Sequence, residues 1–217
     1  MFLDDERHYS LLDKAIAHFD HALRTIAGKP LTTDRPHPAE DTPEAELSVT
    51  EKKHVAGLMR VNHAGEVSAQ GLYQGQSLTA RDANIRQNMA ESAKEENDHL
   101  AWCENRLHEL GSHKSVLAPV WYTGSLLIGM IAGLAGDKWS LGFVEETEQQ
   151  VTNHLENHET RLPDQDQKTA KIIAQMKLDE AEHAAKANQA GAEELPYAIK
   201  SLMQAVSKVM TSTAYYI

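Results

Sequence analysis

Two short stretches of the sequence place a carboxylate and a histidine three positions apart. The first is EENDHL at residues 95–100 and the second is DEAEHA at residues 179–184. Residues i and i+3 of a helix project from nearly the same face, so each stretch offers one carboxylate and one imidazole in one direction. Carboxylate oxygens and imidazole nitrogens are common ligands of transition metals. The two stretches are therefore interpreted as two halves of a metal site.

Composition limits the class of protein and its partners. The chain has 217 residues, of which 41% are hydrophobic and 24% charged, as in an ordinary globular domain. Its net charge of −11 argues against a nucleic-acid partner, which would require a basic surface. The single cysteine, Cys103, excludes an internal disulfide and a Cys-x-x-Cys motif, and fits a reducing compartment. The first residues resemble neither a signal peptide nor a transit peptide, so we expect action on the cytoplasmic side.

The spacing of apolar residues predicts an all-α protein. Residues 11–27 have helical spacing, whereas residues 29–47 contain four of the seven prolines and read as a linker. We therefore divide the chain into an N-terminal helix with a Pro-rich linker (1–47) and a bundle domain (48–217). Ser48 and Glu51 form a capping box that opens the bundle. Further helices are expected at about 48–80, 82–110, 137–162, 165–190 and 196–217.

The metal-binding stretches lie on two predicted helical hairpins. Residues equidistant from the turn of an antiparallel pair lie at the same height. The midpoint of Glu66 and Glu96 falls at a predicted break between helices, and so does the midpoint of Glu145 and Glu180. Each hairpin thus carries one glutamate on its first helix and Glu-x-x-His on its second. This is the ligand set of ferritin-like di-iron and di-manganese bundles.

The comparison of heights gives six candidate ligands, although some alternatives to them stay open. The candidates are Glu66, Glu96, His99, Glu145, Glu180 and His183. Glu148 lies one turn after Glu145 on the same apolar stripe and could replace or supplement it. His63 precedes Glu66 by three residues and could support a ligand, although a core or surface histidine is the commoner case. Glu95 and Glu182 flank the ligands and are expected to be solvated or to lie behind them.

Five segments carry a resemblance to a known family. They are RVNHAGEVSAQGLYQGQ (60–76), KEENDHLAWCENRL (94–107), VEETEQQ (144–150), DEAEHAAKA (179–187) and GAEELPYAIKSLMQAVSKV (191–209). With these motifs in this order, the sequence resembles the demethoxyubiquinone hydroxylase family over about residues 48–217. The family's metal ligands fall on the six candidates above, and the VEE motif favours Glu145 over Glu148. Residues 1–47 resemble the extended N-terminus of bacterial members.

The resemblance implies a fold and a reaction. The fold would be a ferritin-like four-helix bundle with additional N-terminal and C-terminal helices. The reaction would be hydroxylation of the ring of a polyprenylated demethoxy-benzoquinol by dioxygen, with two iron ions per chain and an external reductant. No catalytic side chain beyond the metal ligands is implied. A protein partner from the same pathway is also an expectation of the resemblance.

An uncharged run suggests where such a substrate meets the protein. Residues 115–136 contain no charged side chain and are long enough to cross a bilayer. A crossing would place Glu145 on the side opposite Glu66, so the metal site could not assemble. We therefore expect the run to be an interfacial or channel-lining segment of a peripheral, monotopic protein on the cytoplasmic face of the cell membrane. The alternative is a buried helix with glycine-mediated close packing. The apolar face of the C-terminal helix could dock on lipid, on the bundle or on a partner.

Other functions share the same bundle. A ferritin-like protein that oxidises and stores iron would use the same ligands, but it leaves the uncharged run unexplained. A non-catalytic, membrane-docked lipid-binding bundle would not need all six ligands. Rubrerythrin-type peroxidases normally contain Cys-x-x-Cys pairs, and a hydroxylase of transfer RNA would require a basic groove.

Overall fold

The computed structural model describes residues 10–33 and 35–217, and this part of the chain contains helices and no strand. The all-α prediction is confirmed. The helices are α1 (Leu11–Ile26), α2 (Val49–Thr79), α3 (Ala83–Glu109), α4 (Ala118–Ala135), α5 (Asp137–Glu159), α6 (Gln167–Gln189) and α7 (Tyr197–Ala214).

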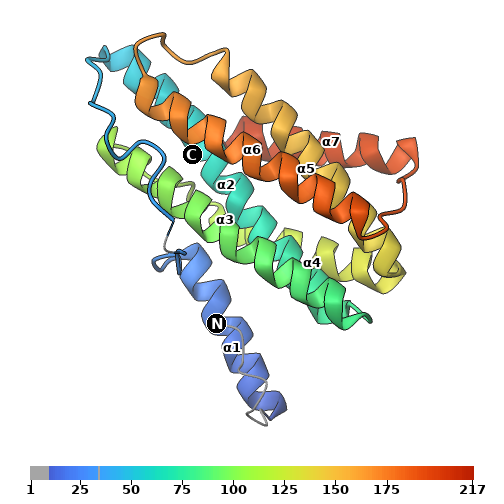
Figure 1. Ribbon diagram of the computed structural model, residues 1–217. Coiled ribbons are helices and arrows are strands. Elements are labelled where there is room, and N and C mark those ends of the chain that lie inside the picture. Colours follow the sequence, from blue (N-terminus) through green and yellow to red (C-terminus); the bar gives the residue numbers. More distant parts are fainter. Residues whose placement is uncertain (1–9, 34) are drawn as a thin grey trace.

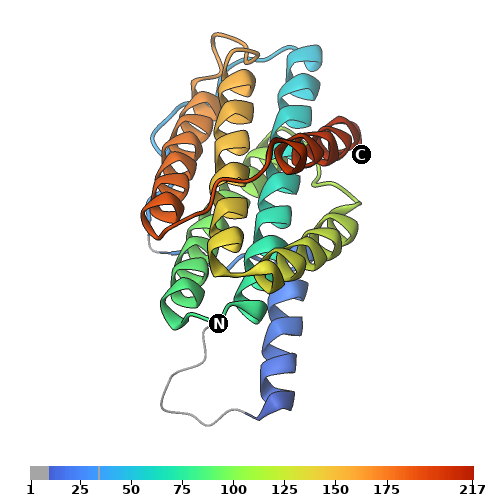
Figure 2. The ribbon, with the colours of Figure 1, turned by 90° about the vertical axis from the view of Figure 1, so that its right-hand side faces the viewer.

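Four long helices form the bundle that the sequence predicts. α2 pairs with α3 and α5 pairs with α6, so the two hairpins lie side by side (Figure 1). α4 links the hairpins and packs closely against α2, whereas α7 crosses the bundle at an angle (Figure 2). α1 extends away from one end of the bundle (Figure 2). A ferritin-like four-helix bundle with additional terminal helices is thereby confirmed.

Local sequence signals set the ends of the bundle helices. The Ser48 side chain accepts a hydrogen bond from the Glu51 backbone and the Glu51 carboxylate accepts one from Ser48, so the predicted capping box begins α2. The Asp166 carboxylate caps α6 by accepting from the backbone N–H of Thr169. After α3 the chain turns at Gly111, whose φ of 68° lies in the left-handed region that glycine tolerates.

The Pro-rich segment before the bundle is packed against it. We call residues 29–33 and 35–47 the strap; its coil runs beside α3 (Figure 1). Ala39 and Leu47 of the strap are buried and join the main apolar core. Glu44 accepts a hydrogen bond of 2.6 Å from Arg106 of α3, and Thr42 accepts one of 2.9 Å from Lys171 of α6. The strap therefore bridges α3 and α6, although the domain division at residue 47 stays a prediction.

The uncharged run forms a helix with two different faces. The inner face of α4 lies so close to α2 that a Cβ on Gly129 would meet the backbone of Leu72, and one on Gly75 would meet the backbone of Leu126. The outer face is apolar and exposed, at Val120, Leu127, Ile128, Ile131 and Leu134. In the described ranges, α4 is the one helix long and apolar enough to cross a membrane. Glycine-mediated packing and an unpaired apolar face thus occur in the same helix.

A pair of glycine substitutions tests the close packing of α2 and α4. Gly129→Ala should destabilise the protein by about 1–3 kcal/mol, because the added methyl group meets backbone that cannot move aside. Gly124→Ala, in the same helix but with nothing within 4 Å of the added Cβ, should be neutral or stabilising by up to about 1 kcal/mol. Chemical denaturation of both variants measures the difference. Equal stability of the two would contradict the packing described here.

Candidate metal centre

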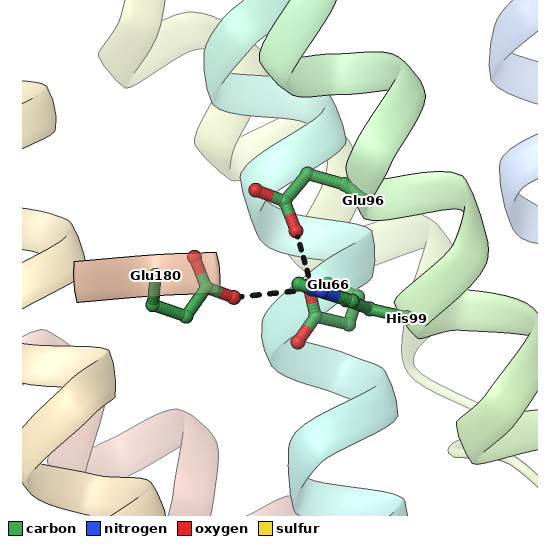
Figure 3. Close-up of side chains that lie close together, drawn as sticks. All are labelled: Glu66, Glu96, His99 and Glu180. Carbon is green, nitrogen blue, oxygen red and sulfur yellow. Dashed lines mark ion pairs between the residues drawn. The ribbon is translucent and has the colours of Figure 1, made fainter. Parts of the chain in front are cut away.

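Four of the predicted ligands converge inside the bundle. Glu66 comes from α2, Glu96 and His99 from α3 and Glu180 from α6, and the side chains point toward one another (Figure 3). One ligand atom from each lies within 4.8 Å of all the others. All four residues are at most 3% exposed. The helical hairpins therefore bring these residues to one height, as the comparison of heights predicts.

The atoms face one another without forming ordinary hydrogen bonds. His99 Nδ1 lies 2.9 Å from Glu96 Oε2, 3.2 Å from Glu180 Oε1 and 3.7 Å from Glu66 Oε2. Even so, His99 Nδ1 and both carboxylate oxygens of Glu96 lack a partner with hydrogen-bond geometry. Buried polar atoms in native proteins normally have partners. Their convergence without good mutual geometry fits ligands aimed at a cation.

The second histidine repeats the arrangement on the other hairpin. His183 of α6 is 1% exposed, and its Nδ1 lies 3.1 Å from Glu96 Oε1 and 3.3 Å from Glu180 Oε2. Glu96 and Glu180 therefore lie between the two imidazoles. In that position the two carboxylates would hold metal ions together with the two imidazoles. Five of the six predicted ligands are thus brought together.

The sixth predicted ligand, Glu145, does not reach the cluster. Its side chain is partly exposed, lines a surface groove between α5 and α6, and accepts a hydrogen bond of 2.9 Å from Asn188. Glu148 takes the inner position instead. It is 1% exposed and accepts a hydrogen bond of 2.6 Å from the Tyr73 hydroxyl. The two glutamates are one turn apart on the same stripe, and the packing of α5 turns Glu148 inward.

Glu148 interacts electrostatically with the glutamates of the cluster. Burial raises the pKa of Glu148 well above its usual range, and the charges of Glu180 and Glu96 raise it further. Burial likewise raises the pKa of Glu66, with the charge of Glu96 adding to the effect. Burial would also raise the pKa of Glu96, but the neighbouring His183 and His99 hold it below its usual range. Charge at any of these side chains therefore affects the others.

A second set of carboxylates lies behind the histidines. His99 Nε2 lies 2.9 Å from Asp179 Oδ2 of α6, and His183 Nε2 lies 2.6 Å from Glu95 Oε2 of α3. Each outer carboxylate therefore holds the histidine of the opposite helix. Metal-binding histidines almost always donate their second ring N–H to such a partner, which fixes the tautomer and the ring orientation. Asp179 and Glu95 each directly precede the glutamate of a Glu-x-x-His motif. This shared position is the sequence signal from which Asp179 could have been predicted.

The remaining residues near the motifs have other surroundings. His63 is 1% exposed, and burial lowers its pKa to about 3, with the charge of Lys114 adding to the effect. It is a core histidine outside the cluster. Glu182 lies at the surface and pairs with Lys186 at 3.1 Å.

The donor set fits two divalent cations. Four buried glutamates carry four negative charges when ionised, which two divalent ions would neutralise. Two imidazoles supply one neutral nitrogen for each ion. This is the composition of the dinuclear sites in ferritin-like bundles. The side chains that would hold the ions are Glu66, Glu96, His99, Glu148, Glu180 and His183.

Comparison with known proteins places the chain in a family. Residues 53–214 match the model of the family described as ubiquinone biosynthesis protein COQ7. The chain belongs to this family. It is 59% identical over 213 residues to a 3-demethoxyubiquinol 3-hydroxylase of Legionella pneumophila (strain Corby), covering 97% of this chain and 100% of the relative. It is 57% identical over 211 residues to the enzyme of that name from Nitrosococcus oceani (97% and 99%), and 54% identical to one from Acinetobacter baumannii (97% and 100%).

The two glutamates of α5 can be distinguished by metal content. Glu148→Gln should lose at least one of two bound ions, because an amide replaces a carboxylate inside the cluster. Glu145→Gln, one turn away at the surface, should retain both ions. Metal analysis after reconstitution with Fe(II) under anaerobic conditions measures the ratio of metal to chain. The reverse ranking would return the ligand role to Glu145.

Proposed function

We propose that this member of the COQ7 family hydroxylates the ring of a polyprenylated demethoxyubiquinol, with dioxygen as co-substrate and two iron ions as cofactor. The observation that carries the proposal is the buried cluster of two Glu-x-x-His motifs with facing glutamates. It occurs in a chain 54–59% identical to enzymes named 3-demethoxyubiquinol 3-hydroxylase. Insertion of one oxygen atom with release of water consumes two electrons, so an external reductant is required.

The side chains of the proposed site have different roles. Two iron ions bound by the cluster would supply the activation of dioxygen. The inner carboxylates would hold the ions together with the two imidazoles. The outer carboxylates, Asp179 and Glu95, hold Nε2 of each imidazole and so direct Nδ1 into the cluster, where it would bind an ion. The Tyr73 hydroxyl holds Glu148 in place from α2.

The substrate of the proposed reaction explains the apolar outer face of α4. A polyprenyl tail in water would cost about 0.8 kcal/mol for each exposed CH₂ group, so the tail must remain in an apolar phase. The exposed apolar side chains of α4, with Leu202, Val206 and Val209 of α7, offer a surface for the lipid interface. Only Gly136 separates α4 from α5, which carries Glu148. We infer a peripheral protein on the cytoplasmic face of the cell membrane, where a protein partner of the same pathway can also reach it.

Turnover tests the proposed reaction directly. The purified iron-loaded protein should convert a demethoxyubiquinol to its hydroxylated product when oxygen and a reductant are supplied. Glu96→Ala or His183→Ala should lose iron and reduce turnover by more than about 100-fold, which exceeds the usual effect of a residue behind the ligands. Mass spectrometry of extracted quinones measures the product. Iron uptake into large particles without quinol turnover would instead identify an iron-storage protein.

A charge on the outer face of α4 tests substrate access. Leu127→Asp should weaken binding to vesicles and reduce turnover of a long-tailed quinol, because this side chain is 55% exposed on the apolar face. Ile131→Lys should act in the same way. Turnover of a short-tailed, water-soluble analogue and the iron content should change little in both variants. Equal loss on the two substrates, together with a lower melting temperature, would show that the face serves packing and not lipid.

A further inference from the structure

An arginine of the strap reaches the back of the metal centre. Arg35 Nη2 lies 2.6 Å from Asp179 Oδ2 on α6, and Arg35 Nε lies 3.4 Å from Asp98 Oδ2 on α3. Its guanidinium also stacks over the ring of Trp102, 4.9 Å from the centroid. The side chain is 35% exposed, while both carboxylates are at most 9% exposed. One cation from outside the bundle thus contacts both helices that carry Glu-x-x-His.

Asp179 also contacts His99, which is a proposed metal ligand. The same oxygen, Asp179 Oδ2, lies 2.9 Å from Nε2 of His99. Arg35, Asp179 and His99 therefore form one chain of charged contacts that ends at the ring whose Nδ1 faces the cluster. A charge-assisted hydrogen bond to arginine is short and directional, so it restricts the orientation of the carboxylate it binds.

The strap is anchored on both sides of this arginine. The Thr33 backbone N–H donates to Asp98 Oδ1 at 2.7 Å, and the Thr33 hydroxyl donates to Asp98 Oδ2 at 2.6 Å. Further along, Ala39 is buried in the core and Glu44 binds Arg106. These anchors reduce the conformational freedom that Arg35 would otherwise lose on binding Asp179. The position of Arg35 is therefore set by the fold of the strap.

The two halves of the cluster differ in the contacts made by the carboxylate behind each histidine. His183 is held by Glu95, which pairs with Lys186 at 3.9 Å, and the Lys186 side chain is 49% exposed. His99 is held by Asp179, which accepts from Arg35 at 2.6 Å and also from Gln175 at 2.9 Å. Arg35 thus binds the carboxylate behind His99 directly, whereas only its charge acts on Glu95 behind His183. An effect of Arg35 on metal binding should accordingly fall on one of two ions.

We propose that Arg35 is a positioning residue of the metal centre, through which the strap fixes Asp179 and hence the ring of His99. The inference rests on the proposed function, because it requires that the cluster holds two metal ions. It assigns the strap the role of completing the metal centre from outside the bundle. Removal of Arg35 leaves Asp179 with the Gln175 hydrogen bond at Oδ1 and without the arginine at Oδ2. The carboxylate can then rotate away from Nε2 of His99, so the ring loses its fixed orientation toward the cluster.

Stepwise metal binding to the full-length protein tests the proposal. Metal-free protein is titrated anaerobically with Fe(II), and near-infrared circular dichroism follows the coordination of each ion. Arg35→Ala should weaken one of the two ions by about 10- to 100-fold, as expected for loss of a partner behind a ligand, and leave the other unchanged. Arg35→Lys should restore part of the affinity. The matched control is Arg24→Ala, which removes an exposed ion pair with Asp20 on α1 and should bind both ions normally.

A second variant shows whether Arg35 acts through Asp179. In an Asp179→Asn background, Arg35→Ala should have little further effect on either ion, because the pathway is already broken. The melting temperature of the metal-free protein should fall only slightly in Arg35→Ala, because Asp98 keeps both hydrogen bonds from Thr33. Unchanged affinities, additive effects of the two substitutions, or equal weakening of both ions with a large drop in melting temperature would each overturn the inference. Failure of the wild-type chain to bind two ions would instead overturn the proposed function.

Discussion

The burial of four glutamates between four helices is the constraint on which the rest of the structure depends. Glu66, Glu96, Glu148 and Glu180 are each at most 3% exposed, although an ionised carboxylate without a partner is costly to remove from water. The charge must be compensated inside the bundle by protons, imidazoles or metal ions. Because such compensation depends steeply on distance, the helices that carry the glutamates must be held in fixed register. The capped helix ends and the close packing of α4 on α2 supply that rigidity far from the cluster itself.

The histidines connect an inner and an outer layer of negative charge. Each ring directs Nδ1 toward the inner glutamates and Nε2 toward an outer carboxylate on the opposite helix. This exchange between α3 and α6 ties the two hairpins together at the height of the metal centre. The strap adds a third connection, because Arg35 contacts Asp98 of α3 and Asp179 of α6. The same contacts that would orient the ligands therefore also hold the hairpins against each other.

Helix positions and ligand heights could be predicted from the sequence, but the rotation of one helix could not. Periodicity, capping residues and hairpin arithmetic use the sequence within one helix or one hairpin. They predict a common level for five side chains that the structure brings together: Glu66, Glu96, His99, Glu180 and His183. Glu145 and Glu148 share a stripe about 60° wide, so only the packing of α5 decides which one points inward. That packing involves Tyr73, which is 75 positions from Glu148 in the sequence. The contact of Arg35 with Asp179 spans 144 positions, and no local pattern reveals it.

α2 links the outer apolar face to the metal centre. Gly71 and Gly75 of α2 face the backbone of α4, whereas Glu66 and Tyr73 of the same helix face the cluster. The inner face of α4 is therefore committed to α2, and only its outer face remains for lipid. A helix is about 10 Å across, so a membrane on the outer face of α4 would lie roughly two helix diameters from the metal ions. In the proposed reaction, the ring of the substrate would cross that distance while its tail stays in the apolar phase. The small residues that bring α4 onto α2 thus keep this distance as short as two packed helices allow.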